Sequence, residues 1–458
     1  MKVIISLLLA TVALSHVSTT PASVVNSALL KAYSTKDHAD IMIVLKAKTS
    51  QVLAQVESQI FATTDDKATT LYNELNRFTS SSQKEILSIL TKFKSSGVKG
   101  FYITNRISVR GAPLELVQAL AHRDDIEEIR EAKVVHIEAP VEVSQERVLE
   151  WGVSQINAPE AWERGYTGAG IVSSNIDTGV RYTHVALRDG YRADYGWFDP
   201  EGNTELPNDQ NAHGTHTMGS IVGRNGTGVA SESMWVACKG CSTSACSEYA
   251  LISCGEWTFC PTNWDGTGSD CTKRPNLSSN SWGGGQEDAW YDEVINSWNS
   301  VNIIPIFALG NSGPGCRTAN SPGDRPNVIS VGATNADDAV AVFSSHGPTL
   351  ATSVIKPEVS APGVNIRSCG IATDTSYTLL SGTSMATPHV AGAVAILLQA
   401  GLATRPEIAT ALETTTVRPE IPEIVCTGGG VNITYPWPNN SYGWGRIDVS
   451  AALNSVLP

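Results

Sequence analysis

The sequence has no cysteine in its first 237 residues and no run of about 18 uninterrupted apolar residues. The second absence argues against a membrane-spanning helix. Charged residues make up only 17% of the 458 positions and leave a net charge of −13, so the excess of basic residues typical of nucleic-acid-binding proteins is missing. Apolar residues reach 41%, which argues against a disordered chain and predicts a folded protein with a hydrophobic core.

The first residues have the pattern of an export signal. Lys2 supplies a positive charge, Val3–Leu14 is apolar, and the small residues of Ala13-Leu14-Ser15 fit a cleavage site. The apolar run is too short to cross a membrane. We therefore expect residues 1–18 to be a signal peptide and the protein to be secreted to the extracellular medium without a membrane anchor.

The nine cysteines are concentrated late in the chain, with six of them between Cys238 and Cys271. In an exported protein this clustering favours disulfide bonds, and the odd number leaves at least one thiol without a partner in the chain. Zinc is the alternative, because Cys238 and Cys241 have the spacing of two metal ligands. A second such pair is missing, so disulfides are the preferred interpretation. Four sequons, which predict a glycoprotein in a host that glycosylates, begin at Asn225, Asn276, Asn432 and Asn439.

Residues 20–140 differ in composition from everything that follows, because they are rich in Lys, Glu, Ala and Leu and contain neither Cys nor Trp. Strand-like and helix-like patterns alternate along them, which predicts a small α+β domain. Residues 71–94 have apolar side chains at helical spacing, with a polar, Ser-rich break in the middle. Residues 141–150 are polar and acidic without a clear period, so we expect a linker there. The other expected elements are strands at 41–46 and 103–109, a helix at 113–121, and a strand pair or one bent strand at 126–137.

Residues 151–458 are richer in Gly and Trp and alternate short apolar strands with helices. Alternation of this kind over about 250 residues predicts an α/β domain built on a doubly wound, mostly parallel sheet. The expected strands lie at 171–176, 234–237, 303–309 and 328–331, and the expected helices at 215–222, 249–256, 287–301 and 384–398.

Three segments of this second domain carry side chains suited to nucleophilic catalysis. Asp177 follows an apolar strand, His213 opens a helix, and Ser384 lies at a Gly-containing turn that begins another helix. In a parallel sheet the carboxyl ends of the strands meet at one edge, so these side chains can converge although they are distant in sequence.

Their chemistry is complementary. A serine hydroxyl is a weak nucleophile that needs an adjacent base, and the imidazole of His213 titrates in the right range to take its proton. A buried carboxylate at Asp177 would orient the ring and stabilise the imidazolium. The negative oxygen that develops in such a reaction needs hydrogen-bond donors already in place. The backbone N–H of Ser384 and the side chain of Asn311 are the candidates.

The order Asp, His, Ser, together with the flanking residues, resembles the subtilase family of serine peptidases. The resemblance runs from about Trp151 to Asp448. It rests on GVSQINAPEAW at 152–162, NSWG at 280–283, FSS at 343–345 and above all GTSMATPHVAG at 382–392. It implies a subtilisin-like fold and a serine endopeptidase with Asp177, His213 and Ser384 as triad and Asn311 as oxyanion donor. In length and residue pattern, the second domain is nearer to bacillopeptidase F-like members than to the kexins.

The resemblance also implies a role for the first domain and for several segments of the second. Residues 20–140 resemble an inhibitory propeptide that is removed at a site within 141–150, so the expected product is a zymogen. Substrate is expected to add as a strand between two enzyme segments, with glycines that let its backbone approach. The matching segments are Ser281-Trp282-Gly283 and Ala308-Leu309-Gly310, and Asn320 is placed at the base of the primary specificity pocket.

Two departures from the family concern calcium. Ala186 stands where many subtilisins have a ligand aspartate, and the loop at 224–228 is shorter than the calcium loop. We therefore expect the usual calcium site to be absent and no cofactor to be required, with structural calcium elsewhere left open. The expected partners are protein or peptide substrates and the propeptide, with neither nucleic acid nor membrane, and the expected state is a monomer.

Two other classes of function compete with this reading. His213 and His216 could belong to a metal-dependent hydrolase, although no HExxH glutamate accompanies them. A secreted binding protein could also keep the fold of a peptidase without its activity. His184, His216 and His389 are otherwise expected to serve packing or hydrogen bonding.

Overall fold

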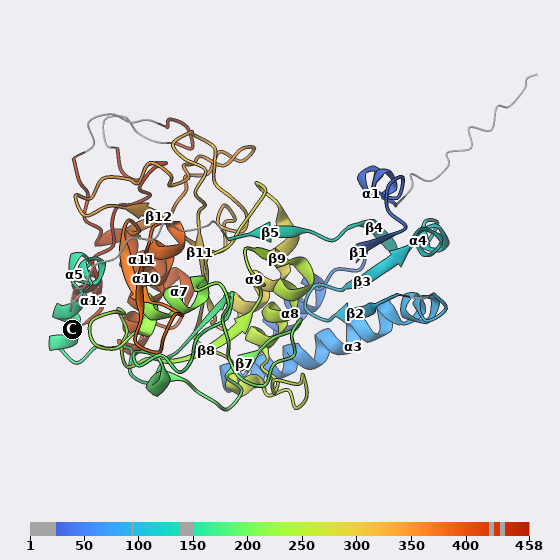
Figure 1. Cartoon of the computed structure of the whole chain (residues 1–458), viewed down its shortest axis with the longest axis horizontal. Coiled ribbons are helices and arrows are strands. Elements are labelled where there is room, and N and C mark those ends of the chain that lie inside the picture. Colours follow the sequence, from blue (N-terminus) through green and yellow to red (C-terminus); the bar gives the residue numbers. More distant parts are fainter. Residues whose placement is uncertain (1–23, 94, 138–149, 421–425, 431–435, 458) are drawn as a thin grey trace, which may run out of the picture.

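The computed structural model describes residues 24–93, 95–137, 150–420, 426–430 and 436–457. The described residues form an N-terminal module, residues 24–137, and a larger α/β domain that begins at residue 150 (Figure 1). The expected signal peptide and most of the expected linker lie outside the described residues.

The N-terminal module contains a four-stranded antiparallel sheet with the strand order β2-β3-β1-β4. Its own core includes Leu29, Ile43, Ile107, Leu116 and Ile129. The sequence prediction of a small α+β domain is thus confirmed as a fold. The elements are α1 (Ser27–Ala32), β1 (His38–Leu45), α2 (Ser50–Glu57), α3 (Thr64–Leu90), β2 (Gly97–Phe101), β3 (Arg106–Pro113), α4 (Leu114–Leu120), β4 (Ile126–Glu131) and β5 (Val134–His136).

The expected Ser-rich break in the helix at 71–94 was wrong, because α3 runs without interruption from Thr64 to Leu90. Two polar residues in its middle face inward. Thr79 and Gln83 are both buried, and Gln83 Nε2 donates to the carbonyl oxygen of Phe101 at 3.0 Å and to Asn105 Oδ1 at 3.0 Å. A polar stretch therefore continues the helix, since its side chains bond to the neighbouring sheet instead of ending the apolar stripe.

The strand expected at 103–109 is displaced, and a neighbouring strand was missed. β3 begins at Arg106 and continues to Pro113, whereas residues 102–105 form the turn that follows β2. Asn105 has a positive φ of 47°, which suits a turn rather than a strand. β2 itself contains two glycines and only one fully buried residue, so its sequence has little strand pattern.

The α/β domain is built on a seven-stranded sheet with the order β13-β12-β11-β10-β6-β8-β7, and all its strand pairs are parallel. The chain moves from β6 to β8 on one side and then crosses to β10 on the other. The end of β6 is therefore the switch point, where parallel sheets bind ligands. The strands of this domain are β6 (Val172–Asp177), β7 (Trp197–Phe198), β8 (Met234–Lys239), β9 (Ala245–Ser247), β10 (Leu277–Asn280), β11 (Ile304–Ala308), β12 (Ile329–Thr334), β13 (Val359–Pro362), β14 (Ile366–Cys369) and β15 (Tyr377–Leu380).

Helices cover both faces of the sheet, which confirms the doubly wound α/β architecture. α7 and α10 pack together on one face, whereas α8 and α9 lie on the other, between the sheet and the N-terminal module (Figure 1). The helix expected at 287–301 begins later, because Glu287 has a φ of 49°. The helices are α5 (Trp151–Gln155), α6 (Ala158–Glu163), α7 (His213–Val222), α8 (Glu248–Phe259), α9 (Asp292–Ser300), α10 (Thr383–Gln399), α11 (Arg405–Thr414) and α12 (Val449–Val456).

Eight of the nine cysteines form disulfide bonds, so the zinc alternative for Cys238 and Cys241 is wrong. These two residues have different partners, because Cys238 on β8 faces α8. Cys369 is the single free thiol, and it is buried. The pairs are Cys238–Cys254, Cys241–Cys246, Cys260–Cys271 and Cys316–Cys426.

We expect the Cys316–Cys426 bond to contribute more stability than the others, because it joins residues 110 positions apart. Replacing both cysteines with serine should lower the free energy of unfolding by about 2–4 kcal/mol. The matched control is the double serine variant of Cys241 and Cys246, which are only 5 positions apart and should cost less. Thermal unfolding of both variants, and of the parent with a reductant but no chelator, measures the effect. Equal melting temperatures in all samples would contradict it.

The sequons differ in accessibility. Asn225 is exposed in a turn, whereas Asn439 is buried, and its side chain bonds to the carbonyl oxygen of Pro436 and to the backbone N–H groups of Ser441 and Tyr442. Asn439 is therefore a poor glycosylation site in the folded protein, and Asn432 lies outside the described residues. None of the described helices combines the length and apolar character needed to cross a membrane.

Candidate active site

Asp177 is the last residue of β6 and is almost fully buried. Its Oδ1 lies 2.7 Å from His213 Nδ1 and also accepts a 2.7 Å hydrogen bond from the backbone N–H of Thr178. The hydroxyl of Thr217 on α7 approaches Oδ2 at 3.3 Å. The carboxylate is thus held by hydrogen bonds on both oxygens, with one of them directed at the imidazole.

His213 is the first residue of α7, and its side chain is completely buried. Because Nδ1 faces a carboxylate, the proton of the neutral ring belongs on Nδ1, which leaves Nε2 as the acceptor. Nε2 has no hydrogen-bond partner among the described residues. Burial lowers the pKa of His213, but the negative charges of Asp177 and Asp209 and the hydrogen bond to Asp177 outweigh it, so the pKa lies above its ordinary value.

Ser384 is the second residue of α10 and follows Gly382 at the turn into the helix. Its hydroxyl donates to the carbonyl oxygen of Ser281 at 3.3 Å, and Ser281 Oγ donates in return to the carbonyl oxygen of Ser384 at 3.0 Å. The hydroxyl of Ser384 therefore bonds to Ser281 and not to His213. The Asp177–His213 half of the expected triad is formed, whereas the Ser384–His213 bond is not made in this structure.

The sheet register explains how these segments meet. β10 pairs with β6 so that Asn280 lies opposite Ile176, which places Ser281 beside Asp177 at the carboxyl edge. Ser281 contacts Ser384 directly, and α7 packs against α10. The structure therefore brings the carboxylate, the imidazole and the hydroxyl to the same edge of the sheet, as expected from the sequence.

Asn311 lies next to the turn that precedes Ser384. Its Oδ1 accepts hydrogen bonds from the backbone N–H and the hydroxyl of Thr383, both at 2.8 Å, which fixes Nδ2 as the free end of the amide. A Cβ atom on Gly382 would lie 3.2 Å from Asn311 Nδ2 and 3.5 Å from the backbone nitrogen of Ser384. The absence of a side chain at Gly382 thus leaves open a space that two hydrogen-bond donors border.

The expected substrate-binding segments follow β10 and end β11. Gly283 and Gly310 both face Asn320: a Cβ atom would lie 3.5 Å from Asn320 Cβ in the first case and 2.6 Å from Asn320 Nδ2 in the second. The side chain of Trp282 points away from this region, because it is buried and packs edge-to-face on Phe307 and on a neighbouring tyrosine. Only its backbone is available to a substrate. Ser281, Ala308 and Leu309 are buried beside these glycines.

Comparison with known families decides the class of the protein. The sequence model of one family, the subtilase family, matches residues 168–445, which is more than half of the chain. The chain belongs to the subtilase family. This confirms the resemblance inferred from the Asp, His and Ser motifs.

Individual relatives agree with this membership. Bacillopeptidase F from Bacillus subtilis (strain 168) is 30% identical over 479 residues, covering 94% of this chain and 32% of that protein. The subtilase described here therefore spans about a third of the length of that relative. An alkaline protease from Alkalihalobacillus alcalophilus is 34% identical over 272 residues, with 58% of this chain and 64% of the relative covered. Subtilisin Savinase from Lederbergia lenta is 34% identical over 254 residues, with 54% and 84% covered.

The strand β9 beside the site was missed by sequence analysis, whereas its partner β5 lies within the strand pair expected at 126–137. β5, the last element of the N-terminal module, pairs antiparallel with β9 (Ala245–Ser247) and makes an isolated bridge from His136 to Gly283. The segment at 308–310 does not pair with β5. β9 is short and lies in the cysteine-rich region, so its sequence offers no alternating pattern from which a strand could be predicted.

Three further histidines of this subtilase, His184, His216 and His389, are held by backbone carbonyls, as expected. His216 Nε2 lies 2.9 Å from the carbonyl oxygen of Ile366, and burial lowers its pKa to about 3. His389 Nδ1 contacts the carbonyl oxygen of Met385, and burial lowers its pKa to about 4. The ring of His184 bonds to Ser376 through Nε2. The geometry gives no support to a metal pair at His213 and His216.

Calcium does not fit the position where many subtilisins bind it. Ala186 is buried in the main core and offers only a methyl group there. The described residues contain no group of three or more His, Cys, Asp or Glu side chains placed to hold a metal ion. We derive no catalytic step from a metal.

Proposed function

We propose that this subtilase is a secreted serine endopeptidase that is made as a zymogen and cleaves protein substrates through an acyl-enzyme on Ser384. His213 acts as base and then as acid, Asp177 orients it, and Asn311 helps to bind the oxyanion. The observation that carries this proposal is the buried 2.7 Å contact between Asp177 and His213, with Nε2 left available at the edge of the sheet where the first turn of α10 carries Ser384. A buried ring nitrogen without a hydrogen-bond partner lowers the stability of the fold, so its presence calls for an explanation. Accepting the proton of Ser384 during catalysis is such an explanation.

Peptide-bond cleavage by this arrangement would proceed through proton transfer, attack on the carbonyl carbon and hydrolysis of an acyl-enzyme. Rotation of the Ser384 hydroxyl away from Ser281 would bring its proton to Nε2, as catalytic hydrogen bonds often form only with substrate present. The oxygen then attacks the carbonyl carbon, and the oxyanion lies between the Ser384 N–H and Asn311 Nδ2. Protonation of the leaving amine by His213 gives the acyl-enzyme, which water hydrolyses by the same route.

A fluorophosphonate probe tests the proposed function. The purified mature protein should be labelled on Ser384 and should lose its peptidase activity in proportion. A metal-dependent hydrolase would instead be inhibited by a chelator and would not be labelled, and a binding protein on the same fold would show neither response. Absence of labelling in a correctly folded mature protein would refute the proposal.

Asn311 has a separate prediction. Replacing it with alanine should reduce kcat by about 10²–10³-fold, because one oxyanion donor is lost while the other remains. KM should change little, since the donor acts on charge that develops in the transition state. Steady-state hydrolysis of a chromogenic peptide measures both constants. Full activity in this variant would remove the assigned role. Asn335→Ala is the matched control, because that side chain caps a surface turn away from the site.

The N-terminal module is proposed to be the inhibitory propeptide. It would be cut from the enzyme within 141–150 and stay bound to it without a covalent link until it dissociates. The position of β5 supports this. His136 N–H faces the carbonyl oxygen of Gly283 at 3.4 Å, and the N–H of Ile137 donates to the carbonyl oxygen of Ser244 at 2.9 Å. The end of the module thus lies between β9 and Gly283, close to Ser281, where an extended substrate would add as a strand.

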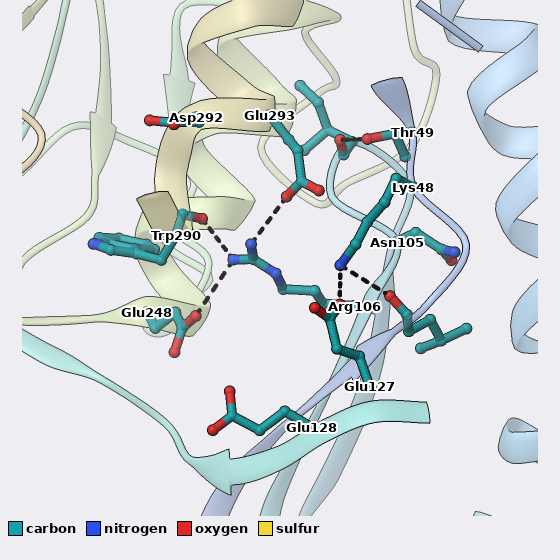
Figure 2. Close-up of polar contacts among 12 residues, drawn as sticks. Lys48, Thr49, Asn105, Arg106, Glu127, Glu128, Glu248, Trp290, Asp292 and Glu293 are labelled. Atoms are coloured by element: carbon teal, nitrogen blue, oxygen red, sulfur yellow. Dashed lines mark hydrogen bonds and ion pairs between the residues drawn. The ribbon is translucent and has the colours of Figure 1, made fainter. Parts of the chain in front are cut away.

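The charges across the interface support a specific pairing of module and enzyme. Arg106 on β3 reaches between two helices, with 2.9 Å to Glu293, 3.7 Å to Glu248 and 2.5 Å to the carbonyl oxygen of Trp290 (Figure 2). Arg130 adds a bidentate contact to Glu248 at 2.6 and 2.7 Å. The side chain of Glu248 is fully buried, so cations of the module neutralise it. Further pairs are Lys99 with Glu256, Arg110 with Glu201, Lys133 with Asp288 and, with opposite polarity, Asp65 with Arg274.

Replacing Arg106 with methionine should release the cut module sooner. Breaking one side of a buried ion pair leaves Glu293 without its cation and costs several kcal/mol, which should speed dissociation roughly 100-fold or more. The recovery of peptidase activity after processing measures the rate. The control is Lys36→Met, which removes a cation whose ion pair with Glu131 is exposed within the module. Equal rates for the two variants would show that Arg106 does not contribute to retention.

The same proposal includes secretion, a monomeric enzyme and no required cofactor. Four disulfide bonds support an oxidising, extracellular environment. The export-like pattern of residues 1–18 supports the same destination. Calcium elsewhere in the protein is left to a chelator experiment.

A further inference from the structure

A second carboxylate, that of Asp209, lies in the loop immediately before α7. Its Oδ1 accepts hydrogen bonds from the backbone N–H groups of Asn211 at 2.9 Å and Ala212 at 3.1 Å. Its Oδ2 accepts from the N–H of Thr215 at 3.0 Å and from the Thr215 hydroxyl at 2.6 Å. One side chain therefore gathers donors from both sides of His213.

These contacts complete the N-terminus of α7. The first N–H groups of a helix have no partner within it, and the N-cap residue here is Ala212, whose side chain cannot accept a hydrogen bond. Asn211 Oδ1 accepts from the N–H of His213 at 3.3 Å, and the Thr178 hydroxyl accepts from Gly214 at 2.9 Å. Asp209 supplies the third acceptor. The turn that carries His213 is thus fixed by side chains from outside the helix.

The backbone at this point is strained. Ala212 has a φ of +83°, a conformation that glycine adopts freely and alanine avoids. Such a conformation persists only where surrounding contacts hold it in place. The contacts that do so here come from Asp209, whose Oδ1 bonds to the N–H of Ala212 itself.

Asp209 also connects the His213 turn to the segment that carries Asp177. It forms an isolated bridge with Gly179, two residues after Asp177, and the Thr215 hydroxyl accepts from the backbone N–H of Arg181. The two segments whose side chains meet at 2.7 Å are therefore joined a second time through Asp209 and Thr215.

We propose that Asp209 is a positioning residue for His213: it holds the strained turn at Ala212 so that the imidazole keeps its orientation toward Asp177. This rests on the proposed peptidase function. Asp209 touches neither substrate nor the reacting atoms, and it acts through His213.

The charge of Asp209 acts on the ring of His213 together with that of Asp177. It raises the pKa of His213, whereas burial lowers it and Asp177 contributes the larger electrostatic increase. The pKa of Asp209 is itself raised by burial, against the opposing effect of its hydrogen bonds. The charged and titratable groups on the elements packed around α7 are Asp177 on β6, Lys239 on β8, Arg367 and Cys369 on β14, His389 on α10 and His216 on α7 itself.

Asp209→Asn in the processed, mature enzyme tests the proposal. All four groups bonded to Asp209 are donors, so an amide NH₂ must leave at least one of them without an acceptor. We expect kcat to fall roughly 10- to 100-fold, as for other small displacements of a catalytic group, with KM changed less than about twofold. Because a negative charge near the imidazolium is removed, the acid limb of kcat/KM should move to lower pH.

Ala212→Gly separates the two effects. Glycine relieves the strained φ, so Asp209→Asn/Ala212→Gly should recover much of the lost kcat, whereas the acid limb should stay at the lower pH. The matched control is Asp199→Asn, since that carboxylate holds a turn in the same way through Gly202 and Thr204 but away from His213. It should leave the position of the acid limb unchanged.

Each outcome decides the matter. An unchanged acid limb in Asp209→Asn, or recovery of both kcat and the limb by glycine, would overturn the charge effect. Unchanged kcat in Asp209→Asn would overturn the positioning role. If neither Asp209→Asn nor Asp209→Asn/Ala212→Gly folds, Asp209 serves the stability of the protein instead. If the parent protein has no peptidase activity, the proposed function fails, and the NMR titration of His213 with and without Asp209→Asn still tests this inference.

Discussion

Replacing Ser384 with alanine is expected to reduce kcat by about 10⁶-fold, the size of the effect seen when serine peptidases of this family lose their nucleophile. Alanine removes the hydroxyl that bonds to the carbonyl oxygen of Ser281, while the hydrogen bonds of Asn311 to Thr383 stay intact. The fold should therefore be unchanged. Hydrolysis of a peptide substrate, with active-site titration of the parent enzyme, measures the loss.

The same variant also tests whether the protein cuts its own N-terminal module. If the enzyme cuts its own linker, the Ser384→Ala chain should accumulate as an uncut precursor with the N-terminal module attached. Ser381→Ala is the control, because its hydroxyl lies three residues earlier and bonds to Asn365, accepting from its backbone N–H and donating to its Oδ1. That variant should be processed normally. Efficient processing of the Ser384→Ala chain in purified form would mean that another peptidase makes the cut.

Replacing Asp177 with asparagine should reduce kcat by about 10⁴-fold. The amide has nearly the shape of the carboxylate, but its NH₂ group facing Nδ1 would favour the ring tautomer with the proton on Nε2, which cannot accept a proton from Ser384. Loss of the negative charge also lowers the pKa of His213, which the structure places above its ordinary value because of Asp177. The residual activity should therefore retain its acid limb at lower pH than in the parent enzyme.

The pH profile of kcat/KM and a crystal structure of the variant test this together. Asp189→Asn is a suitable control, since this carboxylate is exposed and lies 3.7 Å from its arginine neighbours. An Asp177→Asn enzyme with the parent's kcat, in an unchanged structure, would remove Asp177 from the mechanism. A higher pH for the acid limb would contradict the electrostatic account.

The positions of the three candidate catalytic segments could be predicted from sequence because each is defined locally. Asp177 follows an apolar strand, His213 opens a helix, and Ser384 lies in a distinctive run, so strand ends and helix starts placed all three at one edge of a parallel sheet. Four strands of the sheet, β6, β8, β11 and β12, were predicted for the same reason, since buried parallel strands are continuous apolar runs. β10 (Leu277–Asn280), in the middle of the sheet, was not among the strands predicted from apolar runs.

What failed depends on contacts between distant segments. β9 exists because β5 pairs with it, and β9 has no pattern of its own, whereas β5 lies within the strand pair expected at 126–137. The polar stretch of α3 was predicted to be a break because its sequence does not reveal the hydrogen bonds of Gln83. These bonds reach Phe101 and Asn105, which lie outside the helix. Asp209 was overlooked because an aspartate in a loop is usually a turn residue, and only its two oxygens, one on each side of His213, reveal the difference.

The disulfide pairing could not be deduced either, since Cys238 and Cys241 are three residues apart and yet bond to different partners. The direction of the Ser384 hydroxyl is a further example. Sequence predicts that it can reach His213, but the competing carbonyl oxygen of Ser281 enters only once β10 lies beside β6.

The strand β5, held between β9 and Gly283, has a consequence for timing. While the chain is continuous, this strand is present at a high effective concentration and no dilution can remove it. Once the linker is cut, the same contacts become a bimolecular equilibrium that dilution shifts toward separation. An enzyme of this design would stay inhibited where its concentration is high and become active as it is diluted by diffusion away from its source.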